Sequence, residues 1–265
     1  MNNIKYYAFP SSVADAMNIL LNRKYKALVM AGGTLVGKAI PATAETYLDI
    51  RNLPLKDIKV KGGKLVIGAA ATFDDIDNSE LCREWAGGIL SQVASQCSSQ
   101  LIRNMATIGG NIARPHSFNM FPVVLMCMGA EVMLETKNGK ILVPYASLSQ
   151  NKNLKPGENC IILEVLLPKK TKTQTFEFIK LAKTKSSWES YVTLCFSNEK
   201  KNPKFVVGAL TPRPFCAVEA EKAFAKGAPA EEILQKFTAA IEAVKVTGYR
   251  AEAATNLLRR YLGAE

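Results

Sequence analysis

The sequence predicts an α+β protein with three consecutive parts, and three patterns lead to this prediction. Within residues 1–56, short apolar strands alternate with helical segments, which indicates a small α/β unit with parallel strands. Residues 57–168 combine hairpin signals with apolar helices, which predicts a mixed sheet covered by helices. Residues 169–265 place strands before amphipathic helices, which predicts an α+β C-terminal domain with a three-stranded antiparallel sheet and a helical bundle.

The first part begins with a predicted helix. Ser11 or Ser12 is placed to cap a helix over residues 13–21, where apolar side chains recur at helical spacing. Short buried strands are expected over residues 27–30 and 47–50. A helical turn is expected between them, over residues 34–38.

Hairpins and one long strand define the sheet of the second part. Gly62-Gly63 separates apolar segments 58–61 and 64–67, which is a two-residue hairpin signal. Asn138-Gly139 does the same between residues 131–136 and 140–143. The apolar run over residues 160–167 predicts a further strand, closed by Pro168.

The helices of the second part are predicted from caps and periodicity. Thr72 and Asp75 form a carboxylate variant of the capping box. Residues 81–96 have helical periodicity, although Gly87-Gly88 in the middle costs roughly 1 kcal/mol per glycine. Residues 121–128 are apolar enough for a buried helix, with Pro122 in its first turn.

The third part has strand signals followed by helix signals. The expected strands cover residues 173–181, 191–196 and 205–210. The expected helices lie near residues 215–226, 230–246 and 248–262.

Two glycine pairs follow apolar runs and are the most specific local feature of the chain. Gly109-Gly110 lies between Thr107 and Asn111, and a similar segment at residues 31–35 contains Gly32-Gly33. Because glycine reaches left-handed φ without steric cost, both segments are predicted to be turns, over which a ligand lies close to the main chain. Their backbone N–H groups would then cradle one phosphate-bearing anion. The alternative is a pair of plain tight turns between packed elements.

Composition disfavours several classes of protein. The net charge is +11 and the pI about 9.3, but lysine and arginine are spread along the chain without a nucleic-acid-binding motif. A basic surface facing an acidic partner subunit explains the excess charge. No apolar run reaches the roughly 20 residues of a membrane span, and the N-terminus lacks a signal-peptide core, so a cytoplasmic location is expected.

Cysteine and histidine usage also limits the chemistry. The six cysteines include no CxxC pair, so buried thiols in a reducing compartment are expected and a metal site is not. Any iron–sulfur centre would then belong to another chain. His116 is the only histidine, which disfavours a Ser-His-Asp triad. The absence of a GxGxxG fingerprint disfavours a Rossmann domain.

Three motifs together resemble one family. Arg-Asn-Met-Ala-Thr-Ile-Gly-Gly-Asn-Ile-Ala at residues 103–113, Ala-Gly-Gly-Thr-Leu at 31–35 and Gly-Ala-Leu-Thr-Pro-Arg-Pro at 208–214 resemble the FAD-binding medium subunit of molybdenum hydroxylases. These are enzymes of the xanthine dehydrogenase and carbon monoxide dehydrogenase type. The resemblance covers nearly the whole chain and implies a two-subdomain FAD-binding fold of the PCMH/vanillyl-alcohol-oxidase type. It also implies a non-covalent FAD, whose ring carries the redox step without a catalytic residue from the protein.

The resemblance also implies a set of site residues. The main chain of residues 31–35 and 107–111 would hold the FAD diphosphate, with Ile102 and Ile108 near the flavin edge. The expected cofactor-binding residues are Met30, Ala31, Gly32, Gly33, Thr34, Leu35, Ile102, Ala106, Thr107, Ile108, Gly109, Gly110, Asn111, Asn119, Ile162 and Lys180.

The segment after the second glycine pair departs from the family pattern. Residues 114–122 are one residue shorter than usual, and Asn119 stands where the family has an aspartate that binds cofactor hydroxyls. An asparagine loses the charge-assisted hydrogen bond that a carboxylate would accept. His116 in this loop either contacts the flavin or a partner, or faces solvent.

The C-terminal part is expected to supply a basic residue near the flavin pyrimidine edge. The family resemblance leaves Lys180, Lys183 and Lys185 as candidates. Trp188 and Tyr191 lie in the same stretch and could shape the same region, but core packing is the expected role of each.

The resemblance implies a subunit of a larger oxidoreductase. An iron–sulfur small subunit would deliver electrons to the FAD, which would pass them to NAD or another acceptor, while substrate is hydroxylated on a molybdopterin-binding large subunit. Three alternatives stay open: a flavin-free scaffold subunit, a stand-alone FAD-dependent reductase and a nucleic-acid-binding protein. Neither nucleic acid nor a membrane is an expected partner.

Overall fold

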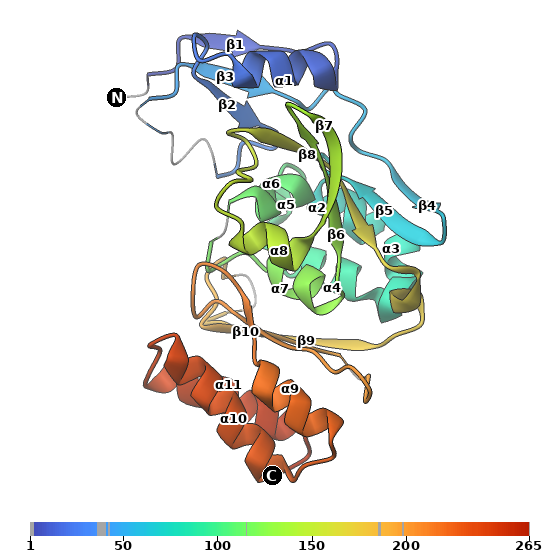
Figure 1. Cartoon of the computed structure of the whole chain (residues 1–265), viewed down its shortest axis with the longest axis vertical. Coiled ribbons are helices and arrows are strands. Elements are labelled where there is room, and N and C mark those ends of the chain that lie inside the picture. The colour runs from blue at the N-terminus through green and yellow to red at the C-terminus, as the bar shows by residue number, and fades with distance from the viewer. Residues whose placement is uncertain are drawn as a thin grey trace.

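Three sheets follow one another along the chain. The computed structural model describes residues 3–35, 41, 43–114, 116–184, 187–197 and 199–264. Figure 1 shows the N-terminal sheet at one end, the largest sheet with its helices in the middle, and the C-terminal helices at the other end. The division into domains at residues 56 and 168 stays a prediction.

The N-terminal sheet is parallel, as predicted. Its strand order is β1-β3-β2, and both neighbouring pairs run in the same direction. Helix α1 (Val13–Leu21) begins at Ser12, whose hydroxyl accepts from the Asp15 N–H at 3.1 Å. Residues 36–38 of the expected helical turn lie outside the described residues. The strands are β1 (Tyr6–Ala8), β2 (Ala27–Met30) and β3 (Thr46–Asp49).

The middle sheet contains both predicted hairpins. Its order is β4-β5-β8-β6-β7, and every neighbouring pair is antiparallel, where a mixed sheet was expected. The reason is that β8 lies between β5 and β6 and runs opposite to both. The strands are β4 (Ile58–Lys61), β5 (Lys64–Gly68), β6 (Glu131–Thr136), β7 (Gly139–Pro144) and β8 (Cys160–Leu167).

The helices of the middle part include one difference from prediction. The helix expected over residues 81–96 is broken at η1 (Trp85–Gly88), where Ala86, Gly87 and Gly88 all have positive φ. The capping box of Thr72 and Asp75 is present, and Pro122 lies in the first turn of α7. The helices are α2 (Phe73–Asn78), α3 (Glu80–Glu84), α4 (Ile89–Ser95), α5 (Gln100–Arg103), α6 (Ile108–Ala113), α7 (Phe121–Cys127) and α8 (Tyr145–Gln150).

The C-terminal part is an antiparallel sheet packed against helices. The sheet has the order β12-β11-β10-β9, one strand more than predicted, because β12 has only two residues and gives no sequence signal. One set of its strand residues packs with the C-terminal helices in a core of its own, whereas Phe178, Cys195 and Val206 belong to the core of the middle part. The elements are η2 (Lys169–Lys172), β9 (Phe176–Leu181), β10 (Val192–Ser197), β11 (Phe205–Gly208), β12 (Phe215–Cys216), α9 (Val218–Ala225), α10 (Ala230–Ala243) and α11 (Tyr249–Tyr261).

Among the described residues, no helix combines the length and the apolar character that crossing a membrane requires. All six cysteines are free thiols. Cys82, Cys127, Cys160 and Cys195 are buried, whereas Cys97 and Cys216 are half-buried.

Candidate functional site

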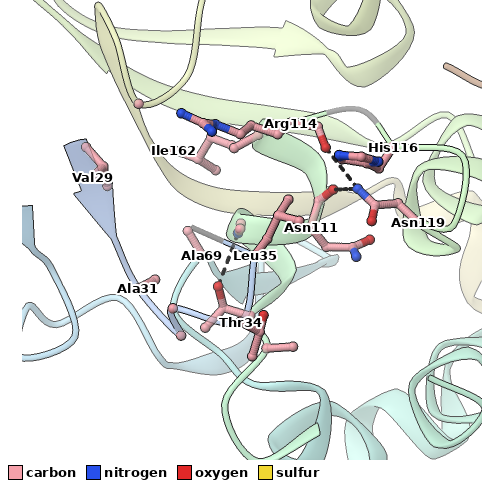
Figure 2. A pocket seen from close by; sticks show the side chains of 18 of the residues that line it. Val29, Ala31, Thr34, Leu35, Ala69, Asn111, Arg114, His116, Asn119 and Ile162 are labelled. Carbon is pink, nitrogen blue, oxygen red and sulfur yellow. Dashed lines mark hydrogen bonds between the residues drawn. The ribbon is translucent and has the colours of Figure 1, made fainter. Parts of the chain in front are cut away.

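A cavity lies where the glycine segments, the middle sheet and the loop before β10 come together. Its volume is about 460 Å³, which falls in the usual range of cofactor sites, roughly 300–1,000 Å³. The end of β2, the starts of α5 and α6, the loop over residues 114–119 and strand β8 all contribute to its walls. Figure 2 shows side chains from these elements around the cavity.

The two glycine segments lie side by side, as the sequence predicted. A Cβ built on Gly32 would fall 1.7 Å from the Met105 carbonyl oxygen and 3.2 Å from the Ala106 nitrogen. A glycine is therefore required at position 32, where the first segment contacts the two residues that directly precede the second. Residues of both segments line the cavity.

The first segment, residues 31–35, has the predicted turn geometry. Gly33 has a φ of +71°, in the left-handed region that favours glycine. None of the described residues accepts a hydrogen bond from the amides of residues 32–35. These N–H groups are free to donate to a ligand in the cavity.

The second segment is not the predicted turn. Gly109 and Gly110 lie in the first turn of α6, with Thr107 as its N-cap, and neither has positive φ. The Ala69 carbonyl oxygen lies 2.7 Å from where a Gly109 Cβ would be, so close packing explains this glycine.

The amides of residues 108–111 in the second segment are already paired within the protein. Ile108 N–H donates to the Ala71 carbonyl at 3.0 Å, and Gly109 N–H donates to the Ala69 carbonyl at 2.9 Å. Gly110 N–H donates to the Thr107 hydroxyl at 3.1 Å, and Asn111 N–H to the Thr107 carbonyl at 2.9 Å. The prediction that both segments offer amides to one diphosphate is therefore wrong for residues 108–111.

Most of the predicted site residues line the cavity, and three do not. Ile108 is fully buried in the central core, because the first position of α6 points into the middle sheet. Met30 ends β2 beside the cavity, and Lys180 lies behind its wall. The lining residues among those predicted are Ala31, Gly32, Gly33, Thr34, Leu35, Ile102, Ala106, Thr107, Gly109, Gly110, Asn111, Asn119 and Ile162.

Lys180 connects two walls of the cavity. Its Nζ donates to the Gln96 carbonyl at 3.0 Å and to the Ser187 carbonyl at 2.8 Å, and burial lowers its pKa. Gln96 directly precedes Cys97 and Ser98, and Ser187 directly precedes Trp188, and these three following residues line the cavity. Of the other candidate lysines, Lys183 is exposed and Lys185 lies outside the described residues.

An aromatic wall closes one side of the cavity. The rings of His116 and Phe118 stack with centroids 4.4 Å apart, and Phe118 meets Trp188 edge-on at 5.0 Å. Trp188 is 56% exposed and Tyr191 is 41% exposed, so the expectation that both pack in a core is wrong. Trp188 lines the cavity instead, while Tyr191 packs against Tyr249.

The loop over residues 114–119 is braced from within by Asn119. This side chain is only 4% exposed, and its Nδ2 donates to the Asn111 carbonyl at 2.6 Å and to the Arg114 carbonyl at 2.9 Å (Figure 2). Asn119 therefore binds the protein's own main chain at the position where the family has a hydroxyl-binding aspartate.

Sequence reasoning missed several lining residues. Arg114 was treated only as part of an altered loop, and Val29 and Ile161 only as strand residues. Pro156-Gly157 lies in the wall beside Val29, and this dipeptide is a turn signal that was readable in the sequence.

The residues present fit a flavin dinucleotide. Free amides at residues 32–35 suit a diphosphate, and apolar side chains such as Val29 and Ile162 suit flat aromatic rings. The Oδ1 atom of Asn111 is buried without a hydrogen-bond partner, which leaves an acceptor for a ligand hydroxyl. No aspartate or glutamate is among the described lining residues. The described residues also include no cluster of three or more potential metal ligands.

Comparisons with known proteins agree with this fit. The family model for the FAD binding domain in molybdopterin dehydrogenase matches residues 2–170. The carbon monoxide dehydrogenase medium chain of Hydrogenophaga pseudoflava is 27% identical over 194 residues, which are 69% of this chain and 65% of that protein. The nicotinate dehydrogenase FAD-subunit of Eubacterium barkeri is 28% identical over 197 residues, which are 70% of this chain and 65% of that protein. The chain thus spans just under two thirds of these relatives.

The likeness of fold extends over nearly the whole chain. Reconstituted CO dehydrogenase from Oligotropha carboxidovorans contains a chain that superposes with a TM-score of 0.83 at 25% identity. The superposition covers 98% of this chain and 96% of that chain, and it confirms the predicted fold class. Because the family match extends over more than half of the residues, the chain belongs to the family of FAD-binding domains of molybdopterin dehydrogenases.

Proposed function

We propose that this chain is the FAD-binding electron-transfer subunit of a multi-subunit molybdenum hydroxylase. In this role it receives electrons from an iron–sulfur subunit and passes them through FAD to NAD or another acceptor. The relatives support the proposal, because their names describe a medium chain and an FAD-subunit of dehydrogenases.

The observation that carries the proposal is the cavity at the two contacting glycine segments. Residues 32–35 would donate their free amides to the diphosphate, and Asn111 Oδ1 would accept from a hydroxyl. Apolar side chains and the aromatic wall would exclude water from the ring system. When bound, FAD supplies both one-electron and hydride chemistry, so the protein needs to contribute binding, orientation and electrostatics.

Two apolar side chains beside the cavity support a partner subunit. Leu101 is 77% exposed and Met105 is 50% exposed, and they flank Ile102 in the cavity wall. Exposed apolar side chains next to a functional site are typical of protein interfaces. We propose that the iron–sulfur subunit covers this side, that the molybdopterin subunit carries the hydroxylation site, and that the complex is cytoplasmic, where six free thiols remain reduced.

The test is the visible absorption spectrum of the purified full chain before and after incubation with FAD. The proposal predicts a yellow protein, or a colourless one that takes up about one FAD per chain. A protein that stays colourless after reconstitution would contradict the proposal and favour the flavin-free scaffold. Co-purification with iron–sulfur and molybdopterin subunits tests the assembly.

A further inference from the structure

We propose that Arg114 supplies the positive charge that holds the diphosphate-bearing part of the cofactor, and that Asn119 is the positioning residue that fixes Arg114. This inference rests on the proposed function. It assigns to this chain a charge contact that the family resemblance does not imply.

The need for a charged contact follows from the second glycine segment. A flavin dinucleotide carries negative charge on its diphosphate, and amides from two segments were expected to meet it. The N–H groups of residues 108–111 all donate hydrogen bonds to acceptors inside the protein. Among the described residues of the two segments, the amides left without an acceptor are those of residues 32–35 and of Thr107, so fewer amides than expected can meet the anion and a charged donor would add to them.

Arg114 is the charged side chain that the cavity provides. Among the described lining residues, no other carries a formal charge at neutral pH. No carboxylate among the described residues pairs with its guanidinium, so its donors remain available. Figure 2 shows this side chain reaching along the cavity toward Ile162, away from its own loop. A guanidinium presents planar, paired donors that match phosphate oxygens.

Asn119 holds the main chain from which Arg114 extends. Its amide nitrogen donates both hydrogen atoms, one to the Asn111 carbonyl and one to the Arg114 carbonyl. A carboxylate accepts hydrogen bonds and has no hydrogen to donate, so aspartate could make neither contact. Asparagine at position 119 can therefore hold the main chain at Arg114, and it adds no negative charge beside that cation.

The experiment measures dissociation constants of the full chain for FAD, ADP and riboflavin, by calorimetry and flavin fluorescence. ADP carries a diphosphate without a flavin, and riboflavin carries a flavin without phosphate. Arg114→Met is expected to lower the affinities for FAD and ADP by roughly ten- to hundred-fold and to leave the affinity for riboflavin unchanged. The salt dependence of FAD binding should become shallower. Arg114→Lys, which keeps the charge but loses the planar fork, should give an intermediate loss.

Asn119→Asp tests the positioning role. Asn119→Asp should lower the affinities for FAD and ADP as Arg114→Met does and leave the affinity for riboflavin unchanged. The reason is that the loop loses both hydrogen bonds donated by Asn119 and gains a negative charge. The matched control is Arg23→Met, which removes the same charge from an exposed position after α1. It should leave the dissociation constants for all three ligands unchanged. Thermal unfolding of each variant identifies any general loss of folding.

The outcomes separate this inference from the function on which it rests. Equal FAD affinity in wild type and Arg114→Met would overturn the inference alone. An equal loss for riboflavin and FAD would also overturn it, since Arg114 would then act by packing. A wild-type chain that binds ADP through Arg114 but not FAD would overturn the proposed function and leave the charge contact standing.

Discussion

The two glycine segments look alike in sequence and differ in structure. Residues 31–35 form a turn with positive φ at Gly33 and with amides that no described residue accepts. Gly109 and Gly110 are helical, and the amides around them are bonded to Ala69, Ala71 and Thr107. The first segment therefore leaves amides available for a ligand, whereas residues 108–111 of the second segment are bonded and packed within the protein.

The difference shows that a glycine pair can have two physical causes. At Gly33 the cause is backbone conformation, because an L-residue with a side chain rarely adopts that φ. At Gly32 and Gly109 the cause is a neighbouring carbonyl oxygen, 1.7 Å and 2.7 Å from where a Cβ would lie. Each cause makes its own prediction for an alanine substitution.

Gly32→Ala is expected to have the largest effect. Its Cβ would overlap the Met105 carbonyl, so the two segments must separate. Unfolding should become easier by about 3 kcal/mol or more, the upper end of the range for overpacked sites, and FAD affinity should fall with it. Chemical denaturation and FAD titration measure the two effects.

The control for Gly32→Ala is Gly62→Ala. Gly62 has a φ of +59° in the β4–β5 turn, and a Cβ there would meet no atom within 4 Å. It should show only the conformational cost, about 1–2 kcal/mol. A Gly32→Ala protein as stable as this control would contradict the close contact between the segments.

The next largest effect on stability is expected in the second segment, where alanine substitutions at Gly109 and Gly110 distinguish close packing from backbone conformation as the reason for each glycine. Gly109→Ala should destabilise by about 2 kcal/mol, because its Cβ would lie 2.7 Å from both the carbonyl oxygen and the Cβ of Ala69. Gly110→Ala should be nearly neutral, since its single close contact is the Thr107 hydroxyl at 3.0 Å, and alanine favours a helix by about 1 kcal/mol. Large and equal losses for both would mean that the segment is a left-handed turn after all.

Lys180→Met is expected to have a smaller effect on stability, about 1 kcal/mol, because it removes two donations from a half-buried ammonium group. The effect on the cavity should be visible separately, since the wall carrying Trp188 loses its link to Cys97 and Ser98. Emission of Trp188 should shift in Lys180→Met and be restored in Lys180→Arg. An unchanged emission spectrum would show that Lys180 does not position this wall.

The smallest expected effect on stability depends on pH and concerns Asp49, which lies next to the start of the first segment. Asp49 pairs in register with Met30, the residue before that segment. Burial raises the pKa of Asp49, but hydrogen bonds from Arg51 outweigh it and leave the pKa below its ordinary value. The ionised form is thus favoured in the folded protein, and its contribution is present above the ordinary pKa and lost as pH falls through the lowered one.

Asp49→Asn should therefore be less stable than wild type at neutral pH, by no more than about 1 kcal/mol. The difference should disappear in acid, below the folded-state pKa of Asp49. Unfolding free energies measured for both proteins from neutral to acid pH test this. A constant difference across the series would exclude the ion pair as its source.

The predictable parts of the fold depend on neighbours in sequence. Ser12 caps α1 and Asn138-Gly139 turns the β6–β7 hairpin, because each signal acts within a few residues. Gly87-Gly88 marked a weak point in the helix expected over residues 81–96, but the break itself was not predicted, since helical periodicity continues across it while Ala86 adopts a φ of 54°. Gly109 was misread for the same reason: the atom that requires a glycine belongs to Ala69, forty positions earlier.

The candidate site was predicted in outline by resemblance and missed in its chain-specific details. The lining by residues 31–35 and Asn111 follows from motifs that the family shares. Arg114 and Trp188 line the cavity, and Asn119 and Lys180 donate hydrogen bonds to the main chain of the segments that carry them. These side-chain-to-carbonyl bonds span only five and seven positions, but they lie in loops without helical or strand periodicity and so leave no recognisable pattern in the sequence.

Amide hydrogen exchange, resolved by residue and measured with and without FAD, tests the contrast between the two segments most directly. Without FAD, residues 32–35 should exchange fast and residues 108–111 slowly, because only the latter amides have acceptors. FAD should then slow exchange at residues 32–35 and leave residues 108–111 unchanged. Fast exchange at residues 108–111 that FAD suppresses would contradict the account.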